Sequence, residues 1–103
     1  MHHFSSVLLV AHIDISRSHT LGLDGARRAA EAVAARLVAE FGVRASWAGD
    51  TLRVEGRGVK GALEALPSVV RVTASLGLAA RPFRRALRRE IERELDRVAP
   101  LPA

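Results

Sequence analysis

Residues 43–76 read VRASWAGDTLRVEGRGVKGALEALPSVVRVTASL, and apolar side chains fall at every second position along most of this stretch. Charged or hydroxyl residues fill most of the positions between them, which is the pattern of strands with one dry face and one wet face. Turn signals at Gly49-Asp50, at Gly56-Arg57-Gly58 and at Leu66-Pro67-Ser68 divide the stretch into four short strands. Strands spaced so closely pair with their neighbours in sequence, so we predict an antiparallel meander. The positions assigned to its dry face are Ala45, Trp47, Leu52, Val54, Val59, Gly61, Leu63, Val70, Val72, Ala74 and Leu76.

Two amphipathic segments flank the predicted sheet and can cover its apolar face. The segment 21–41 follows the helix-start chemistry of Ser18-His19-Thr20 and ends before Gly42, a left-handed stop. The segment 82–98 begins at Pro82, which is favoured at the first helical position. Apolar side chains recur every three or four residues in both segments and define two buried stripes. These stripes are Leu23, Ala26, Ala30, Val33, Leu37 and Phe41 in the first helix, and Phe83, Leu87, Ile91, Leu95 and Val98 in the second.

The residues before the first helix favour one more strand. Odd-numbered positions from Val7 to Ile15 are apolar, and we expect a strand at least across His12–Arg17. We therefore predict an α+β fold, an antiparallel sheet of four to five strands covered on one face by two helices, in the order β-α-β-β-β-β-α. This single domain spans residues 12–99, with residues 1–11 as a leader or an extension of the first strand and residues 100–103 as a C-terminal tail.

The composition excludes several classes of chemistry. The chain contains no cysteine, which rules out disulfides, thiolate metal sites and thiol nucleophiles and agrees with a cytoplasmic setting. No apolar run approaches the length that spans a bilayer, and the first residues lack the basic region of a signal peptide. Tyrosine is absent, no nucleophile elbow or helical pair of metal ligands occurs, and we interpret His2-His3 as incidental. The sequence therefore predicts no enzyme, no catalytic residue, no metal site and no cofactor.

Fifteen arginines and one lysine give the chain a formal net charge of +5. Arginines fill the start of the last helix, and acids dominate its second half. The helix dipole favours acids at the start of a helix and bases at its end, so this charge order opposes the dipole. The helix start would suit a phosphate-bearing lipid, a nucleic acid or an acidic protein. It could instead be a solvated face, with pairs such as Arg88 and Glu92, and the sequence alone favours this simpler interpretation because such charge runs are common. The arginines at the start of this helix are Arg81, Arg84, Arg85, Arg88 and Arg89.

Two positions in the predicted sheet stand out. Trp47 is the only tryptophan, and we expect a core anchor whose indole N–H reaches a partner at the rim. A chain with 4% aromatic residues lacks the stacking platforms of single-strand nucleic-acid binders, so we do not expect a nucleic-acid partner. Gly61 indicates a close approach of backbone.

Because an open sheet leaves two edge strands, a two-fold homodimer is a further expectation.

Several short runs, taken together and in this order, form a fairly specific pattern over nearly all of residues 13–96. They are Ile13-Asp14-Ile15-Ser16-Arg17-Ser18-His19-Thr20-Leu21, Ala26-Arg27, Phe41-Gly42, Trp47-Ala48-Gly49-Asp50, Leu52, Gly58-Val59-Lys60-Gly61, Leu76-Gly77, and Pro82-Phe83 through Ile91 to Leu95-Asp96. On these residues the chain resembles the polyhydroxyalkanoic acid system family, small bacterial proteins encoded near the genes for storage polyester granules. The basic pairs Arg84-Arg85 and Arg88-Arg89 depart from the family's pattern.

The resemblance implies a cytoplasmic bacterial protein linked to polyhydroxyalkanoate metabolism or to the granule surface, and it transfers no catalytic residue. Arg17 and His19 match the family's opening motif, and we expect them to form a polar cluster with Trp47 and Asp50 across the sheet. Such a cluster would be structural first and ligand-binding second.

Two classes of function remain open. The first is a non-enzymatic accessory protein that meets the granule surface, granule proteins or an acidic partner through the basic helix. The second is a small-molecule binder with a pocket for a hydroxyacyl-type compound between helices and sheet. A cavity of several hundred Å³ lined by the predicted core residues would favour the second.

Overall fold

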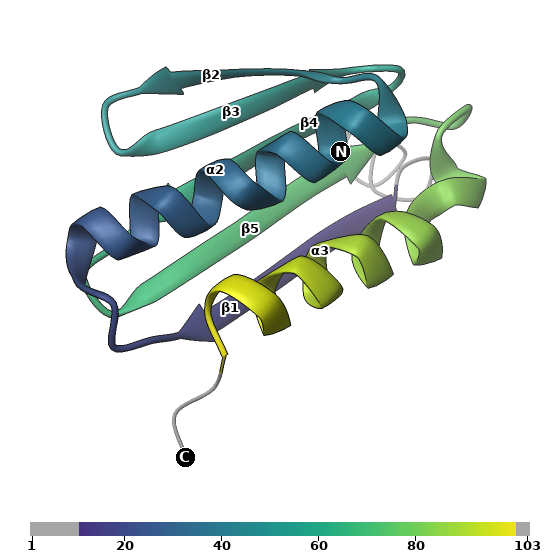
Figure 1. The fold of residues 1–103 in the computed structure, drawn as a ribbon. Coiled ribbons are helices and arrows are strands. Elements are labelled where there is room, and N and C mark those ends of the chain that lie inside the picture. The colour runs from purple at the N-terminus through teal and green to yellow at the C-terminus, as the bar shows by residue number, and fades with distance from the viewer. Residues whose placement is uncertain (1–10, 101–103) are drawn as a thin grey trace, which may run out of the picture.

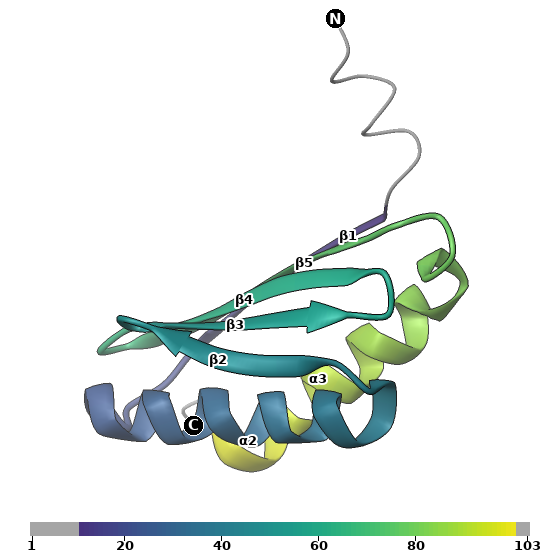
Figure 2. The same cartoon turned by 90° about the horizontal axis from the view of Figure 1, so that it is seen from above.

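Five antiparallel strands form one sheet, and two helices lie side by side on one of its faces (Figures 1 and 2). The computed structural model describes residues 11–100. Along the chain the elements are β1 (Ala11–Ser18), α2 (Gly22–Phe41), β2 (Arg44–Ala48), β3 (Thr51–Gly56), β4 (Val59–Ala65), β5 (Val69–Leu76), the 3-10 turn η1 (Arg81–Phe83) and α3 (Arg84–Val98). The predicted α+β fold and its element order are confirmed. The expectations for His2-His3, for most of the leader 1–11 and for most of the tail 100–103 lie outside the described residues.

The sheet order is β1-β5-β4-β3-β2, so the meander from β2 to β5 is extended by β1 at the far side. Pairing sets Ile13 opposite Ala74, Ala74 opposite Gly61, and Gly61 opposite Val54, which keeps the dry positions of four strands in one row. Gly61 is required at this row because a Cβ there would lie 2.9 Å from the Thr73 carbonyl oxygen. The predicted close approach of backbone is thus confirmed, with β5 as the neighbour.

The core lies between the sheet and the helices. Alanines on α2 let this helix sit close to the sheet, and α3 contributes Leu87, Ile91 and Leu95, which are at most 2% exposed. Each large side chain buried this completely contributes about 1.5–3 kcal/mol of transfer free energy. α2 ends as expected, because Gly42 adopts φ 68° and its N–H donates to the Val38 carbonyl.

Some side chains predicted to be buried are exposed, and they lie at the ends of the helices and at the edge of the sheet. Leu23 in the first turn of α2 is 41% exposed, and Phe83 in η1 is 57% exposed, because both residues precede the part of the helix that lies over the core. Ala45 on the edge strand β2 is exposed as well, and Trp47 is only half-buried. These exceptions are among the apolar side chains that remain available to a partner.

Both helix starts also differ from their predictions. β1 continues through Ser18, and the N-cap of α2 is Leu21 with no side-chain cap, so Ser18 and Thr20 do not cap this helix. Pro82 lies in the 3-10 turn, and regular α-helix begins only at Arg84. A proline fixes its own φ but does not determine whether the turn closes as a 3-10 or an α-helical turn.

Candidate functional site

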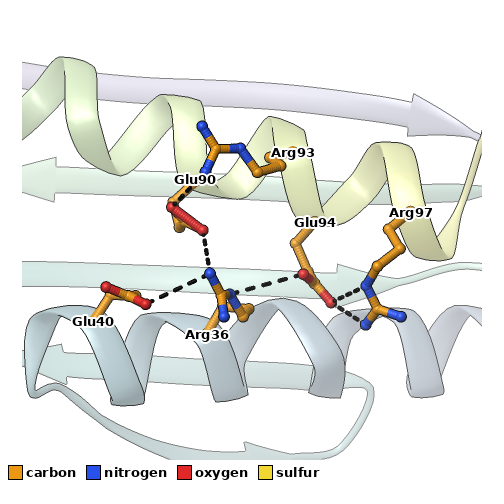
Figure 3. A network of polar contacts seen from close by, with 6 residues as sticks. All are labelled: Arg36, Glu40, Glu90, Arg93, Glu94 and Arg97. Atoms are coloured by element: carbon orange, nitrogen blue, oxygen red, sulfur yellow. Dashed lines mark hydrogen bonds and ion pairs between the residues drawn. The ribbon is translucent and has the colours of Figure 1, made fainter.

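The two halves of α3 carry opposite charges and lie in different surroundings. In the second half, Glu90 and Glu94 face α2 and meet Arg36 (Figure 3). The Arg36 Nη2 lies 2.7 Å from Glu90 Oε1 and 3.5 Å from Glu40 Oε1, and the Arg36 Nε lies 3.9 Å from Glu94 Oε1. Glu94, only 6% exposed, also accepts hydrogen bonds from Arg97. Glu90 and Glu94 of α3 are therefore used inside the molecule to join its two helices.

This network has an electrostatic signature. The hydrogen bond from Arg36 and its charge hold the pKa of Glu90 below its ordinary value, against the opposing effect of desolvation. The same pair raises the pKa of Arg36. Both shifts mean that the charged forms are favoured in the folded protein, so this part of α3 is stabilised by ion pairs within the molecule.

Arg17 compensates the negative end of α3. Its side chain is 10% exposed, its Nη1 donates to the Ala99 carbonyl at 3.2 Å, and its Nη2 lies 2.9 Å from Asp96 Oδ1. A cation at a helix C-terminus satisfies free carbonyl groups and offsets the dipole. This arginine on β1 therefore holds the end of α3 against the sheet.

His19 has a structural role at the same end of the sheet. The Leu21 N–H donates to its Nδ1 at 3.1 Å, so the Nε2 carries the proton that the Leu66 carbonyl accepts at 3.1 Å. The ring is 4% exposed and connects the start of α2 to the turn between β4 and β5. It presents no free nitrogen for a ligand.

Trp47 and Asp50 belong to a different group of residues, at the opposite edge of the sheet. Arg27 stacks over the indole with its guanidinium carbon 4.0 Å from the ring centroid, and its Nη1 donates to Asp50 Oδ1 at 3.0 Å. The Trp47 N–H donates to Glu31 Oε2 at 3.0 Å, so the expected rim partner exists. The structure does not bring Arg17, His19, Trp47 and Asp50 together, because β1 and β2 are separated by three strands.

The arginines in the first half of the last helical segment form few ion pairs or hydrogen bonds with the rest of the molecule. Arg88 pairs with Glu92 at 2.9 Å, as the helical spacing predicts, and Arg84 Nε donates to the His12 carbonyl at 3.0 Å. Arg81, Arg85 and Arg89 are exposed and form no ion pair with any residue in the range 11–100. Three guanidinium groups therefore face solvent from one helix start.

Two large apolar side chains accompany these arginines. Leu78 is 67% exposed and Phe83 is 57% exposed, more than any other large apolar residue in the described part of the chain. Both lie in the segment that connects β5 to α3, at the end of the molecule where η1 projects (Figure 1). We call Leu78, Phe83 and the arginines Arg81, Arg84, Arg85, Arg88 and Arg89 the basic corner.

An apolar cavity of about 420 Å³ opens beside the basic corner. It lies where the end of α2, the β3–β4 turn and η1 converge, and not between the helices and the centre of the sheet. Arg57 stands at its rim with φ 55°, a left-handed conformation that is uncommon for a residue with a side chain. The cavity is lined by Glu40, Phe41, Gly42, Arg57, Val59, Leu76, Ala79, Ala80, Phe83 and Leu87.

Sequence reasoning missed Arg36, Glu90 and Glu94 as a network, Arg27 as the partner of Trp47, and Leu78 as an exposed residue. Glu90 and Glu94 lie four residues apart and next to the stripe of Leu87, Ile91 and Leu95, a spacing that could have indicated acids near a helix interface. Within residues 11–100 no three acids or histidines gather as metal ligands, and no helix there has the length and apolarity to cross a membrane.

Comparison with known proteins supplies the family. No curated protein and no solved structure matches the chain, so no relative assigns a role to any residue. A family model described as "Putative polyhydroxyalkanoic acid system protein" matches residues 13–98, which include every strand and helix except the first two residues of β1. The chain belongs to this polyhydroxyalkanoic acid system family.

Proposed function

We propose that this protein is a non-enzymatic accessory protein of the polyhydroxyalkanoate storage system that binds the granule surface through the basic corner. The observation that carries the proposal is that Leu78 and Phe83 are exposed in the same stretch of chain, from the end of β5 to the first turns of α3, as Arg81, Arg85 and Arg89, which have no acidic partner in the described residues. Exposed apolar side chains combined with arginines in one segment are typical of proteins that bind at the boundary between an apolar phase and anionic groups. The family supports the choice of the granule as that boundary.

The expected strength of this contact is modest. Each arginine near an anionic surface contributes about 1 kcal/mol, and burying the exposed parts of Leu78 and Phe83 adds about 1–2 kcal/mol each. For the three unpaired arginines and the two apolar side chains together, a total of about 5–7 kcal/mol corresponds to reversible binding by one copy. The protein would accordingly be cytoplasmic and exchange with the granule surface, with attraction that weakens as salt rises.

Co-sedimentation with purified polyester granules at low and high salt tests the proposal. Replacing Arg81, Arg85 and Arg89 by Gln is expected to weaken binding about a hundredfold. The matched control replaces Arg28, Arg53 and Lys60 by Gln, which removes the same charge from exposed positions elsewhere and should leave most of the binding intact. Equal losses in both triple variants, or no binding by the wild type in either salt condition, would reject the basic corner as the contact.

The same assay separates the surface from an acidic protein partner. Granules stripped of protein and coated with anionic phospholipid retain the apolar phase and the headgroups but no granule proteins. Binding to both native and stripped granules is the expected result. Binding to native granules alone would mean that the partner is an acidic granule protein and not the granule surface itself.

The cavity beside the basic corner favours a second candidate, a binding module for a small hydroxyacyl-type compound. Its walls are mostly apolar, and Arg57 at the rim could pair with a carboxylate. Isothermal titration with a medium-chain 3-hydroxy acid should then show binding that Arg57→Gln weakens and Arg53→Gln does not. Absence of heat for the wild type, with granule binding intact, would dismiss this candidate and leave the first one standing.

A further inference from the structure

The two edges of the sheet are treated differently by the rest of the molecule. At the β1 edge, α3 lies along the strand, and Arg84 donates to the His12 carbonyl at 3.0 Å (Figure 1). At the β2 edge, no hydrogen bond in the described part of the chain engages the backbone of β2 apart from its ladder with β3. One edge is therefore partly occupied by an arginine and a helix, and the other has no such cover.

An apolar groove runs beside the open edge. It lies between α2 and β2 and is lined by Ala34, Ala35, Val38, Ala39, Ala45 and Trp47, together with Glu31, Ser46 and Leu52. Val38 is 42% exposed, and Ala35, Ala39 and Ala45 are exposed too. Ala45 occupies a dry-face position of its strand, yet Figure 1 shows β2 lying outside α2 with no helix beyond it. The core layer thus stops short of its own edge strand.

We infer that this edge and groove bind a second copy of the same chain, with β2 pairing antiparallel to β2 of the partner. A strand edge of unpaired N–H and C=O groups is complementary to itself in antiparallel pairing. The strand contains no proline, lysine or bulge that would oppose such pairing, and its only charge is Arg44. The two α2 helices then lie on the same side of a continuous sheet and cover each other's groove.

The charges of β2 fit a two-fold axis at Ser46. In this register Arg44 lies opposite Ala48 of the second copy, so the two Arg44 side chains stand at opposite ends of the pair. Arg44 is therefore not opposed by a like charge at any position of the pair. Because the β1 edge is partly occupied by Arg84 and α3, we expect the assembly to close at two copies and not to extend into a fibre.

This inference does not depend on granule binding, and its test is the mass of the protein in solution. Light scattering and sedimentation equilibrium from about 1 µM to about 1 mM should give the mass of two chains at the upper end. Val38→Glu and Ala45→Lys place charges in the groove and are expected to raise the dimer dissociation constant at least about tenfold.

The chain offers matched controls. Leu23→Glu changes a residue of the same helix with similar exposure, 41% against 42% for Val38, outside the groove. The matched control for Ala45→Lys is Ser16→Lys, which places a lysine at an exposed position of β1, outside the groove. Circular dichroism checks that all four variants fold. A wild type that stays monomeric over the whole range, or a dimer that the controls weaken as much as the groove variants do, would overturn the inference.

Discussion

The segment from Arg81 to Val98 contains two charged regions that follow each other on one helix and have opposite fates. The acids of the second region, Glu90 and Glu94, are turned toward α2 and paired with Arg36 and Arg97. In the first region Arg81, Arg85 and Arg89 point to solvent without a partner in the described residues. Both placements oppose the helix dipole, but only the acidic one is offset by contacts inside the fold. The difference separates charges that build the structure from charges that are free to act on a partner.

The largest effect is expected where the acidic region ends. Arg17→Met leaves the Ala99 carbonyl and Asp96 without their cation in a site where Arg17 is 9% exposed. We expect the free energy of unfolding to fall by about 2.5 kcal/mol in urea titrations, because a buried acceptor loses a charged donor. Arg53→Met, on an exposed strand position, should cost less than about 0.5 kcal/mol. Similar losses in the two variants would mean that Arg17 does not hold the end of α3.

A smaller effect compares two acids of α3 directly. Glu94→Gln keeps the size of a 6% exposed side chain but removes its charge from Arg36 and Arg97, and should cost about 1.5 kcal/mol of unfolding free energy. Glu92→Gln breaks the exposed pair with Arg88 and should cost less than about 0.5 kcal/mol. If the order of the two losses were reversed, the acids of α3 would not be distinguished by their burial.

The smallest effect is a dependence on pH. The pKa of Glu90 is lowered in the folded protein, so its contribution is present above the ordinary value of 4.5 and is lost as pH falls through its folded value. The drop in urea midpoint between neutral pH and about pH 3 should therefore be smaller in Glu90→Gln than in the wild type. Glu55→Gln, on the exposed face of β3, serves as the control. If the urea midpoint of Glu90→Gln dropped as much as that of the wild type, the ion pair between Glu90 and Arg36 would not contribute to the pH dependence of stability.

Much of the fold could be predicted because its signals are local. Alternation along residues 43–76 and the glycine turns specify the meander, and the helical stripes follow from spacing alone. The pairing of β1 with β5 could not be predicted, because it joins strands more than 50 residues apart and leaves no mark on local periodicity. The exposure of Phe83 and Ala45 likewise depends on where the layers end in space.

The candidate site could be predicted from the sequence only in part, because some of its features depend on contacts between residues far apart in the chain. The five arginines could be located because they lie close together in sequence, within residues 81–89, and the Arg88–Glu92 pair because its spacing is helical. The polar cluster of Arg17, His19, Trp47 and Asp50 was inferred from motifs, and the sheet order places those residues at opposite edges. Leu78 carried no periodic signal that would separate it from a core residue.

The most direct test of the division within this helix is one variant measured in two ways. Arg85→Glu combined with Arg89→Glu places acids near the helix start and creates an i,i+4 pair between position 89 and Arg93. We predict that the free energy of unfolding rises by about 0.5 kcal/mol while binding to polyester granules falls at least about a hundredfold. A loss of stability, or granule binding equal to that of the wild type, would contradict the claim that these arginines are kept for a partner.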